Sequence, residues 1–420
     1  MSEQKKYKII TISDHPLVSS GVGSQTKYIL EGLLKTGKYQ IRSLGGAIKH
    51  ADYRPQKLQE YGDDWIIFPT DGYGDENIIR ELMEVEKPDA IWFMTDPRFF
   101  GWLFSMSDEI RDRGIPLLYY HIWDEKPVPT YNKDFYDSCD FVGCISRLTY
   151  DILKTLKHND FDYIPHAVNA DVFKPFSEEE RLKRKEEALG KNKNKFIYFY
   201  NSRNARRKMT SDVIRFFKGT LDKIGQDKAF LLMHTDPHDQ EGANLFEVCK
   251  MLQLTPDQIS FSNQRVPPEQ MTIFYNISDA TVCLSNNEGF GLSSLESLMC
   301  GTPVISVRTG GLKDQNYVEE TGKEFGVSIF PKTKSLTGSQ PIPYIYDCRC
   351  TDEDVLNAYL KIYNMSKEDR DKLGIKCAEH ARNLFKLDDM VKSWDNALVR
   401  KIQEFKKDGG YNGRIKFTKI

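Results

Sequence analysis

Apolar positions in the first part of the chain form short runs that alternate between two spacings. Runs rich in β-branched and aromatic residues are typical of buried strands. Several segments between them repeat apolar residues every three to four positions, as helices packed on a sheet do. Strands are expected at residues 7–12, 65–68, 90–94, 117–121 and 141–145, and helices at 24–35, 77–86 and 150–156. This alternation predicts an α/β fold with a parallel sheet covered by helices on both faces.

The same alternation restarts after an extended segment at residues 164–175, which contains two prolines. Ser177 followed by Glu180 is a capping signal for a helix that reaches about Leu189. Further strands are expected at residues 195–200, 229–233, 259–261, 281–284 and 304–307. Two consecutive alternating units predict two Rossmann-like domains.

The last part of the chain has a different pattern. Residues 330–343 are rich in Pro, Gly, Ser and Thr and are expected to form a loop, whereas residues 352–406 are expected to be helical. The basic, glycine-broken tail at 406–420 is expected to be a solvated strand or a frayed end, with a binding arm as the alternative. The predicted domains are residues 1–170, residues 171–385, and a final helix and tail at residues 386–420.

One motif carries most of the functional information. Glu288 and Glu296 lie eight positions apart around the turn Gly289-Phe290-Gly291, between a β-rich run and a segment with helical spacing. A helix that starts after this turn directs its free N–H groups and the positive end of its dipole at the turn. Such a helix start binds anions and suits a diphosphate.

The motif continues in a way that resembles a known family. Cys300-Gly301-Thr302-Pro303-Val304 follows, and then Gly310-Gly311. Together these stretches resemble the retaining family-4 glycosyltransferases of the GT-B fold, whose hallmark is EGFGL…LE followed by CGTPV and a Gly-Gly turn. The resemblance implies two Rossmann-like domains that face each other across a cleft, with a C-terminal helix that crosses back to the first domain. It also implies that the first domain binds the acceptor and the second binds a nucleoside-diphosphate sugar.

The resemblance assigns roles around the two glutamates. Glu288 is expected to contact hydroxyls of the donor sugar and Glu296 those of the ribose. The expected donor-binding backbone also includes Gly289, Phe290, Gly291, Leu292 and Ser293. The acidic residue that the family has after Gly-Gly is not cleanly matched, and either Asp314 or Gln315 is a candidate for it.

A basic loop follows the first strand of the second unit. Arg203 and Lys208 have the spacing at which the family places an Arg and a Lys on the diphosphate, and Arg206 and Arg207 are additional. An arginine offers a planar fork to two oxygens, whereas a lysine acts as a point charge. We therefore expect Arg203 and Lys208 to act with Glu288 as catalytic residues.

The resemblance adds two features of the first unit to the expected site residues. The loop at residues 19–23 contains Gly21 and Gly23 and opens a helix, so its backbone allows close approach of a ligand. The family places this loop opposite the diphosphate and the acceptor. His121 ends a predicted strand at the ligand edge of the sheet, and family members have a histidine here that contacts the donor sugar. A full Gly-x-Gly-x-x-Gly is missing, which argues against a nicotinamide cofactor.

Composition and charge narrow the class of protein. A content of 40% hydrophobic and 29% charged residues is ordinary for a globular protein. No apolar run reaches the roughly 18 residues that span a bilayer, so we expect a cytoplasmic protein without integral membrane contact. Residues 1–170 contain 20 Lys and Arg against 26 Asp and Glu, and the remainder contains 39 against 35. The basic balance of the second part suits a diphosphate.

No metal or cofactor is expected besides the nucleoside-diphosphate sugar, which is a substrate. The eight cysteines are scattered, and the Cys348-x-Cys350 pair has no second pair to complete a zinc site. The expected reaction is metal-independent transfer with retention to a hydroxyl of a glycan or small molecule. The sequence as a whole also resembles family-4 relatives that large DNA phages carry, so hydroxymethylated DNA bases are an alternative acceptor. Further alternatives are a non-catalytic nucleotide-sugar binding protein and an epimerase on the same fold.

Overall fold

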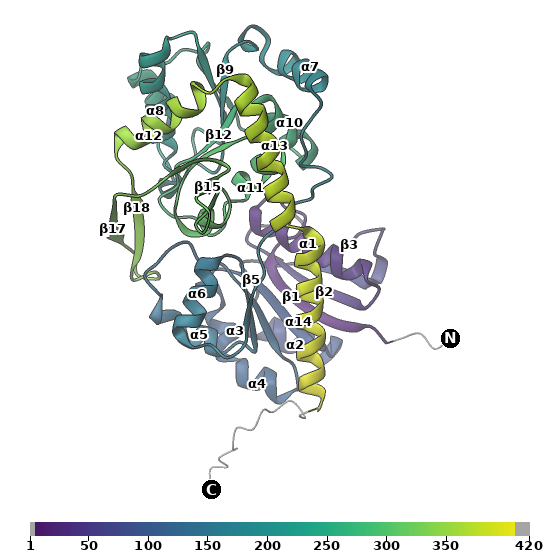
Figure 1. Cartoon of the computed structure of the whole chain (residues 1–420). Helices are drawn as coiled ribbons and strands as arrows, with labels where there is room; N and C mark the ends of the chain where they lie inside the picture. The colour runs from purple at the N-terminus through teal and green to yellow at the C-terminus, as the bar shows by residue number, and fades with distance from the viewer. Residues whose placement is uncertain (1–4, 408–420) are drawn as a thin grey trace. The chain divides into compact units, whose positions relative to one another are not determined.

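The computed structural model describes residues 5–407, which divide into two compact units. Unit 1 comprises residues 5–123, 128–166 and 387–407 of this range, and unit 2 comprises residues 124–127 and 167–386 (Figure 1). Each unit therefore includes a piece of chain that is remote in sequence from its main part. The basic tail expected at the end of the sequence lies, from residue 408 onward, outside the described residues.

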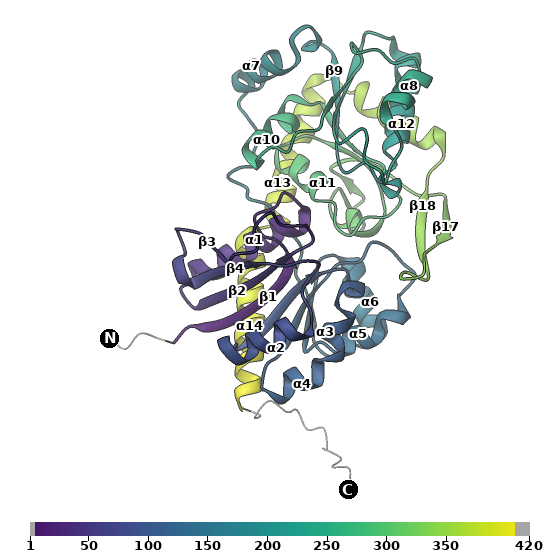
Figure 2. The same ribbon diagram turned by 180° about the vertical axis from the view of Figure 1, so that it is seen from behind.

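Unit 1 is built on one eight-stranded sheet with the order β3-β4-β2-β1-β5-β6-β7-β8. All neighbours are parallel except β3 and β4, which form an antiparallel edge. Figure 2 shows the edge strands β3 and β4 beside β2 and β1. The strands are β1 (Tyr7–Asp14), β2 (Tyr39–Gly46), β3 (Gln56–Lys57), β4 (Trp65–Pro69), β5 (Ala90–Thr95), β6 (Leu117–His121), β7 (Phe141–Cys144) and β8 (Phe161–Tyr163).

Helices of unit 1 include one from the far end of the described chain. They are α1 (Gly21–Lys35), α2 (Glu76–Glu86), α3 (Gly101–Ser105), α4 (Ser107–Asp112), α5 (Lys133–Asp137), α6 (Arg147–Leu156) and α14 (Leu387–Lys407). The last of these, α14, packs against α1 and β7. Trp394 and Leu398 are fully buried there, and the Trp394 ring meets the rings of Trp92 and Tyr120 edge to face. A Cβ at Gly143 would lie 2.5 Å from the Trp394 ring, so only glycine leaves room for this side chain.

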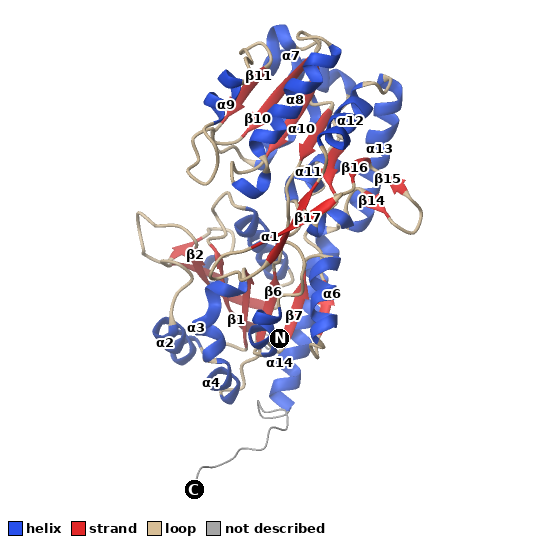
Figure 3. Ribbon diagram, turned by 90° about the vertical axis from the view of Figure 1, so that its left-hand side faces the viewer, coloured by secondary structure: helices blue, strands red, loops and turns tan. Residues whose placement is uncertain are grey.

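Unit 2 contains a six-stranded sheet in which every pair of neighbours is parallel, with the order β11-β10-β9-β12-β13-β16. Two small antiparallel ribbons, β14-β15 and β17-β18, accompany it. Figure 3 shows the strands of this sheet side by side with helices around them. The strands are β9 (Phe196–Asn201), β10 (Ala229–His234), β11 (Ile259–Ser262), β12 (Ala280–Cys283), β13 (Val304–Val307), β14 (Tyr317–Val318), β15 (Lys323–Glu324), β16 (Gly326–Ile329), β17 (Thr333–Thr337) and β18 (Ile345–Arg349).

Helices cover both faces of this second sheet. They are α7 (Glu178–Leu189), α8 (Thr210–Ile224), α9 (Leu245–Met251), α10 (Pro268–Ile277), α11 (Leu292–Met299), α12 (Asp352–Tyr363) and α13 (Lys367–Leu384). Helices α8 and α12 pack together on one face, with α8 against β10 and α12 against β16. Helices α10 and α11 pack together against β9, β12 and β13, and Figure 1 shows the two pairs on opposite sides of the sheet.

Most predicted strands and helices are present within one to three residues of the expected bounds. The prediction of a loop at residues 330–343 is wrong in part, because β17 occupies Thr333–Thr337 and pairs with β18. Most side chains of β17 are exposed and polar, so the hydrophobic spacing does not indicate a strand there. Strand β2 was not predicted, since Arg42 and Ser43 interrupt its apolar run and two glycines end it.

Across residues 5–407, the structure contains no helix that is both long enough and apolar enough to cross a bilayer.

Candidate functional site

Three neighbouring parallel strands of unit 2 bring their carboxyl ends together. Strand β12 pairs with β9 on one side and with β13 on the other. Parallel neighbours end at the same edge of a sheet, so the segments after these strands converge. These segments are the basic loop after β9, the Glu288 turn after β12 and the Gly310-Gly311 turn after β13.

The two glycine turns fit against each other. The N–H of Gly311 donates to the carbonyl oxygen of Glu288 at 2.8 Å. Gly310 has a φ of +45°, and a Cβ there would lie 1.9 Å from that same carbonyl oxygen. Gly291 has a φ of +91°, and a Cβ there would lie 2.4 Å from the side chain of Leu312. Only glycine fits these positions, which explains why the sequence has glycine in both turns.

Helix α11 begins at the Glu288 turn without a side-chain cap. Gly291 is its N-cap residue in a left-handed conformation, and no side chain accepts a hydrogen bond from the first turn. The N–H groups of Ser294 and Leu295 donate to the carbonyl oxygen of Gly291. The N–H groups ahead of them, on Leu292 and Ser293, have no acceptor within the helix. This helix start therefore combines free donors with the positive end of the dipole, as an anion site requires.

Glu288 lies directly before this helix start and is paired with two cations. The Lys208 ammonium donates to its carboxylate, and Arg207 Nη1 lies 3.5 Å from the same oxygen. Burial alone would raise the pKa of Glu288, but the charges of Lys208 and Arg207 hold it below its ordinary value. Glu288 is therefore a buried carboxylate.

Arg207 connects this cluster to a segment that lies far away in sequence. Its Nε lies 3.5 Å from Asp124, and its Nη1 donates to the carbonyl oxygen of Asn287 at 3.0 Å. The Asp124 carbonyl accepts the N–H of Glu288 at 3.3 Å. Burial lowers the pKa of Arg207, but Asp124 and Glu288 outweigh it, and the net shift is upward.

Next to Asp124, Glu125 holds the second glycine turn. Its carboxylate is fully buried and accepts the Gly310 N–H and the Thr309 hydroxyl, both at 2.8 Å, while Lys313 Nζ lies 3.3 Å away. Burial would raise the pKa of Glu125, but Lys313 and the backbone donors keep it below its ordinary value. Sequence analysis missed this role, since Asp-Glu-Lys-Pro has the composition of a solvated loop.

Arg203 is not brought to Glu288. Its guanidinium pairs with Asp239 through two contacts, at 2.6 and 3.0 Å, and its side chain is 64% exposed. The cation that joins Lys208 at Glu288 is Arg207, which the sequence marked only as additional. The short 3-10 helix at Arg206–Lys208 turns Arg207 and Lys208 toward Glu288.

Glu296 lies further along α11 and faces a separate polar group. It accepts the Tyr275 hydroxyl at 2.7 Å, and Asn201 Nδ2 donates to the same hydroxyl at 2.8 Å. Burial raises the pKa of Glu296 to about 7, although the Tyr275 hydroxyl opposes this. Glu296 thus belongs to the helix that follows the turn but makes no hydrogen bond or ion pair with Glu288.

Of the two candidates after Gly-Gly, Gln315 touches the Phe290-Gly291 turn. Its Nε2 donates to the carbonyl oxygens of Phe290 and Gly291 at 2.6 and 3.3 Å, and the residue is fully buried. The Gln315 carbonyl in turn accepts from His380 Nε2 at 2.8 Å. Phe290 packs edge to face on Phe385. Gln315 therefore supports the turn through an amide rather than through a charge.

In unit 1, the glycine loop opens helix α1. Ser20 is the N-cap residue, and its hydroxyl accepts the Gly23 N–H at 2.9 Å while donating to Asp14 at 2.7 Å. A Cβ at Gly23 would lie 2.9 Å from two carbonyl oxygens, whereas Gly21 is the first residue of the helix. Burial raises the pKa of Asp14, against the effect of its hydroxyl donors.

His121, also in unit 1, is fully buried at the end of β6. Its Nε2 lies 2.9 Å from the Tyr136 hydroxyl, and its Nδ1 has no hydrogen-bond partner among the described residues. Burial, with a smaller effect from His158, lowers the pKa of His121 to about 3. The imidazole is therefore neutral near pH 7. Within residues 5–407, no three His, Cys, Asp or Glu side chains are grouped so as to hold a metal ion.

Comparisons with known proteins show which family and fold this chain resembles. Residues 182–325 match the family described as glycosyl transferases group 1. D-inositol 3-phosphate glycosyltransferase of Corynebacterium jeikeium is 29% identical over 36% of this chain and 36% of its own length. N-acetyl-alpha-D-glucosaminyl L-malate synthase of Bacillus anthracis is 26% identical over 43% of this chain and 45% of its own length. The chain thus spans less than half the length of each of these curated relatives.

A solved structure extends the likeness to almost the whole chain at the level of the fold. Sucrose-phosphate synthase from Thermosynechococcus elongatus has a TM-score of 0.73 and 19% identity, with 95% of this chain and all of that chain covered. The predicted α/β class of GT-B type is confirmed. Residues 182–325 are therefore similar to the group 1 glycosyl transferases, and the chain as a whole has the GT-B fold.

Proposed function

We propose that the protein transfers a sugar, with retention of anomeric configuration, from a nucleoside-diphosphate sugar to an acceptor hydroxyl. The observation that carries this proposal is the buried Glu288 carboxylate, paired with Lys208 and Arg207 directly before the uncapped start of α11. A leaving diphosphate gains negative charge as the glycosidic bond breaks, and preorganised cations and N–H groups stabilise such charge.

The residues take the following roles in this proposal. The diphosphate binds the N–H groups of Leu292 and Ser293 together with Lys208 and Arg207. Glu288, released from Lys208 when the phosphate arrives, accepts hydroxyls of the donor sugar. Glu296 accepts the ribose hydroxyls. Arg203 reaches the phosphate only after leaving Asp239, so we expect its contribution to be smaller than that of Lys208.

The bond changes need no protein nucleophile and no metal. The bond between the anomeric carbon and the phosphate oxygen breaks, and the acceptor oxygen forms the new bond on the same face. The acceptor proton passes to the departing phosphate oxygen, so charge and protons balance. By the family resemblance, we further propose that the neutral His121 hydrogen-bonds to the donor sugar through Nδ1 and that the backbone of Gly21 and Gly23 contributes to binding of the diphosphate and the acceptor.

The acceptor class proposed is a small hydroxylated molecule or glycan. The names of the two relatives, an inositol phosphate glycosyltransferase and a glucosaminyl malate synthase, support a small polar acceptor. DNA as an acceptor finds no such support.

A donor panel tests the proposal. Purified protein is mixed with UDP- and GDP-sugars, and release of nucleoside diphosphate is measured with and without hydroxylated acceptors. We expect release for at least one donor, an α-linked product from an α-linked donor by NMR, and strong suppression in Glu288→Gln. Arg206→Gln, an exposed change in the same loop, is the matched control. Binding of donors without any turnover would instead indicate a non-catalytic binding protein, and conversion of the free donor to another sugar would indicate an epimerase.

A further inference from the structure

A cavity lies in unit 2 at the edge of its sheet opposite the Glu288 turn. It has a volume of about 740 Å³ and is lined by α7, α13 and the segments that lead into β9, β12 and β13. Phe196 is the first residue of β9, Asp279 directly precedes β12 and Pro303 directly precedes β13. These strands are parallel, so the cavity lies at their amino ends, whereas the Glu288 turn lies at their carboxyl ends. The cavity is therefore distinct from the candidate donor site.

The cavity is strongly basic. Its lining contains seven Lys or Arg side chains against three Asp or Glu, an excess of four positive charges in a chain whose net charge is −2. The basic residues are Arg181, Lys185, Lys193, Lys195, Lys228, Lys367 and Arg370. Such an excess concentrated within a concave surface attracts anions.

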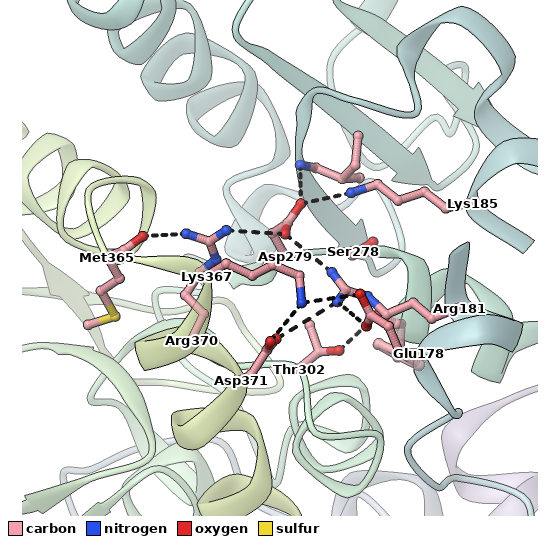
Figure 4. A network of polar contacts seen from close by, with 12 residues as sticks. Glu178, Arg181, Lys185, Ser278, Asp279, Thr302, Met365, Lys367, Arg370 and Asp371 are labelled. Atoms are coloured by element: carbon pink, nitrogen blue, oxygen red, sulfur yellow. Dashed lines mark hydrogen bonds and ion pairs between the residues drawn. The ribbon is translucent and has the colours of Figure 1, made fainter. Parts of the chain in front are cut away.

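Three of these cations share one buried carboxylate. The carboxylate of Asp279 lies 3.2 Å from Lys185, 3.5 Å from Arg181 and 3.8 Å from Arg370. Figure 4 shows these three side chains around Asp279. It also accepts the N–H of Ile197 at 2.8 Å. Glu178 and Asp371 each pair with both Arg181 and Lys367, so four cations face three carboxylates in this group. Burial, together with Arg181 and Arg370, lowers the pKa of Lys185 despite the opposing effect of Asp279. The group therefore keeps one positive charge more than its three carboxylates neutralise.

The surroundings of this cation group indicate the size and kind of ligand. The side chains of Lys185, Arg181 and Arg370 are only 10%, 19% and 17% exposed, so they are recessed and not available to a flat surface. Leu182 and Ile375, which also line the cavity, are 56% and 60% exposed. A volume of several hundred Å³ with convergent polar groups and some apolar lining is typical of small-molecule sites.

We propose that this cavity binds a small phosphomonoester, whose phosphate reaches Arg181, Lys185 and Arg370 while its carbon skeleton contacts Leu182 and Ile375. The site needs no donor sugar and no turnover, so it stands whether or not the proposed transferase activity is correct. A phosphate oxygen offers the acceptors that guanidinium and ammonium groups prefer.

Calorimetric titration of the full chain with inorganic phosphate and with glucose 6-phosphate tests the site. We expect glucose 6-phosphate to bind and Arg181→Gln to weaken binding about tenfold. Arg184→Gln is the matched control, because Arg184 lies on the same helix, is 41% exposed, pairs with Glu187 and does not line the cavity. Lys208→Met, at the donor turn, is expected to leave this binding unchanged.

A second variant covers the risk that loss of Arg181 disturbs folding. Lys195 lines the cavity and donates only to the carbonyl oxygen of Asp257 in the described chain, so Lys195→Gln should fold and still weaken binding. Absence of binding by the wild-type chain would overturn the proposal, as would loss of binding in Lys208→Met. Binding to vesicles that contain phosphatidic acid, without binding of glucose 6-phosphate, would also overturn it in favour of a lipid surface.

Discussion

At the scale of single residues, the candidate site is held together by ion pairs between buried or half-buried side chains. Lys208 and Arg207 face Glu288, and Arg207 also faces Asp124. A carboxylate buried beside cations is stable only while the cations remain, because an unpaired buried charge is costly. An arriving diphosphate would replace one of these partnerships rather than enter an empty site.

Removal of the lysine charge should therefore affect turnover more than removal of Arg203. We expect Lys208→Met to lower kcat/KM for the donor by about 100-fold or more, the usual effect of losing one preorganised electrostatic contact. Arg203→Met should cost much less, since that guanidinium is exposed and pairs with Asp239. Steady-state kinetics of both variants with one donor checks this, and equal losses would contradict the assignment of Arg207 and Lys208 as the main pair.

We expect donor binding to depend on pH through Glu296. Its pKa is about 7 because of burial, so the carboxyl group is largely neutral at pH 6 and largely ionised at pH 8. Only the carboxylate accepts two ribose hydroxyls, so donor affinity should rise with pH across this window. The effect of pH on folding has the opposite sign. A carboxyl group whose pKa is higher in the folded state than in the unfolded state stabilises the folded state at low pH, and this stabilisation declines as pH rises from about 4.5 to 7.

Donor Kd measured from pH 6 to 8 for wild type and Glu296→Gln tests this pH dependence. The variant should bind more weakly at pH 8 and lose most of the slope. A wild-type affinity that does not change with pH would contradict the prediction.

At the scale of elements, the site depends on how two turns fit together. The hydrophobic spacing predicts β12 and β13 well because both are short apolar runs that are buried throughout. It does not predict that Gly310 must approach the backbone of Glu288, because that contact depends on tertiary packing. Nor does it decide which arginine of the basic loop reaches Glu288, because the local turn at Arg206–Lys208 sets the direction of each side chain.

Gly310→Ala should destabilise unit 2 by at least roughly 2 kcal/mol, because the new Cβ would meet two backbone oxygens in a left-handed conformation. Gly37→Ala is the matched control, since Gly37 also has a positive φ but has no atom within 4 Å of a Cβ. It should cost only the conformational strain of about 1 kcal/mol. Urea denaturation of both variants measures the difference, and similar losses would show that the contact of the two turns contributes little.

At the scale of the whole molecule, the two units do not follow the order of the chain, because residues 124–127 belong to unit 2 and residues 387–407 belong to unit 1. The resemblance and the alternating pattern predict the GT-B class, and the fold comparison confirms it. The role of residues 124–127 could not be predicted, because Glu125 meets Thr309 and Gly310 across more than 180 positions of sequence. Local pattern carries no information about such a contact.

Glu125→Ala should lower the free energy of unfolding by roughly 3 kcal/mol, because it leaves Lys313 and buried donors without their acceptor. The pKa of Glu125 is below its ordinary value, so its contribution is present at neutral pH and is lost as pH falls below about 4.5. Glu109→Ala, which removes a more exposed carboxylate from an ion pair, should cost less than 1 kcal/mol. Denaturation curves at pH 7 and pH 4 test both statements.

The place of α14 has a consequence for how the protein is made. Trp394 fills the space that Gly143 leaves, among rings that belong to strands synthesised some 250 to 300 residues earlier. During translation, this apolar face of the first sheet therefore stays uncovered until residue 394 and its neighbours leave the ribosome. The nascent chain should consequently depend on chaperones for its first half, although that half is the first to leave the ribosome.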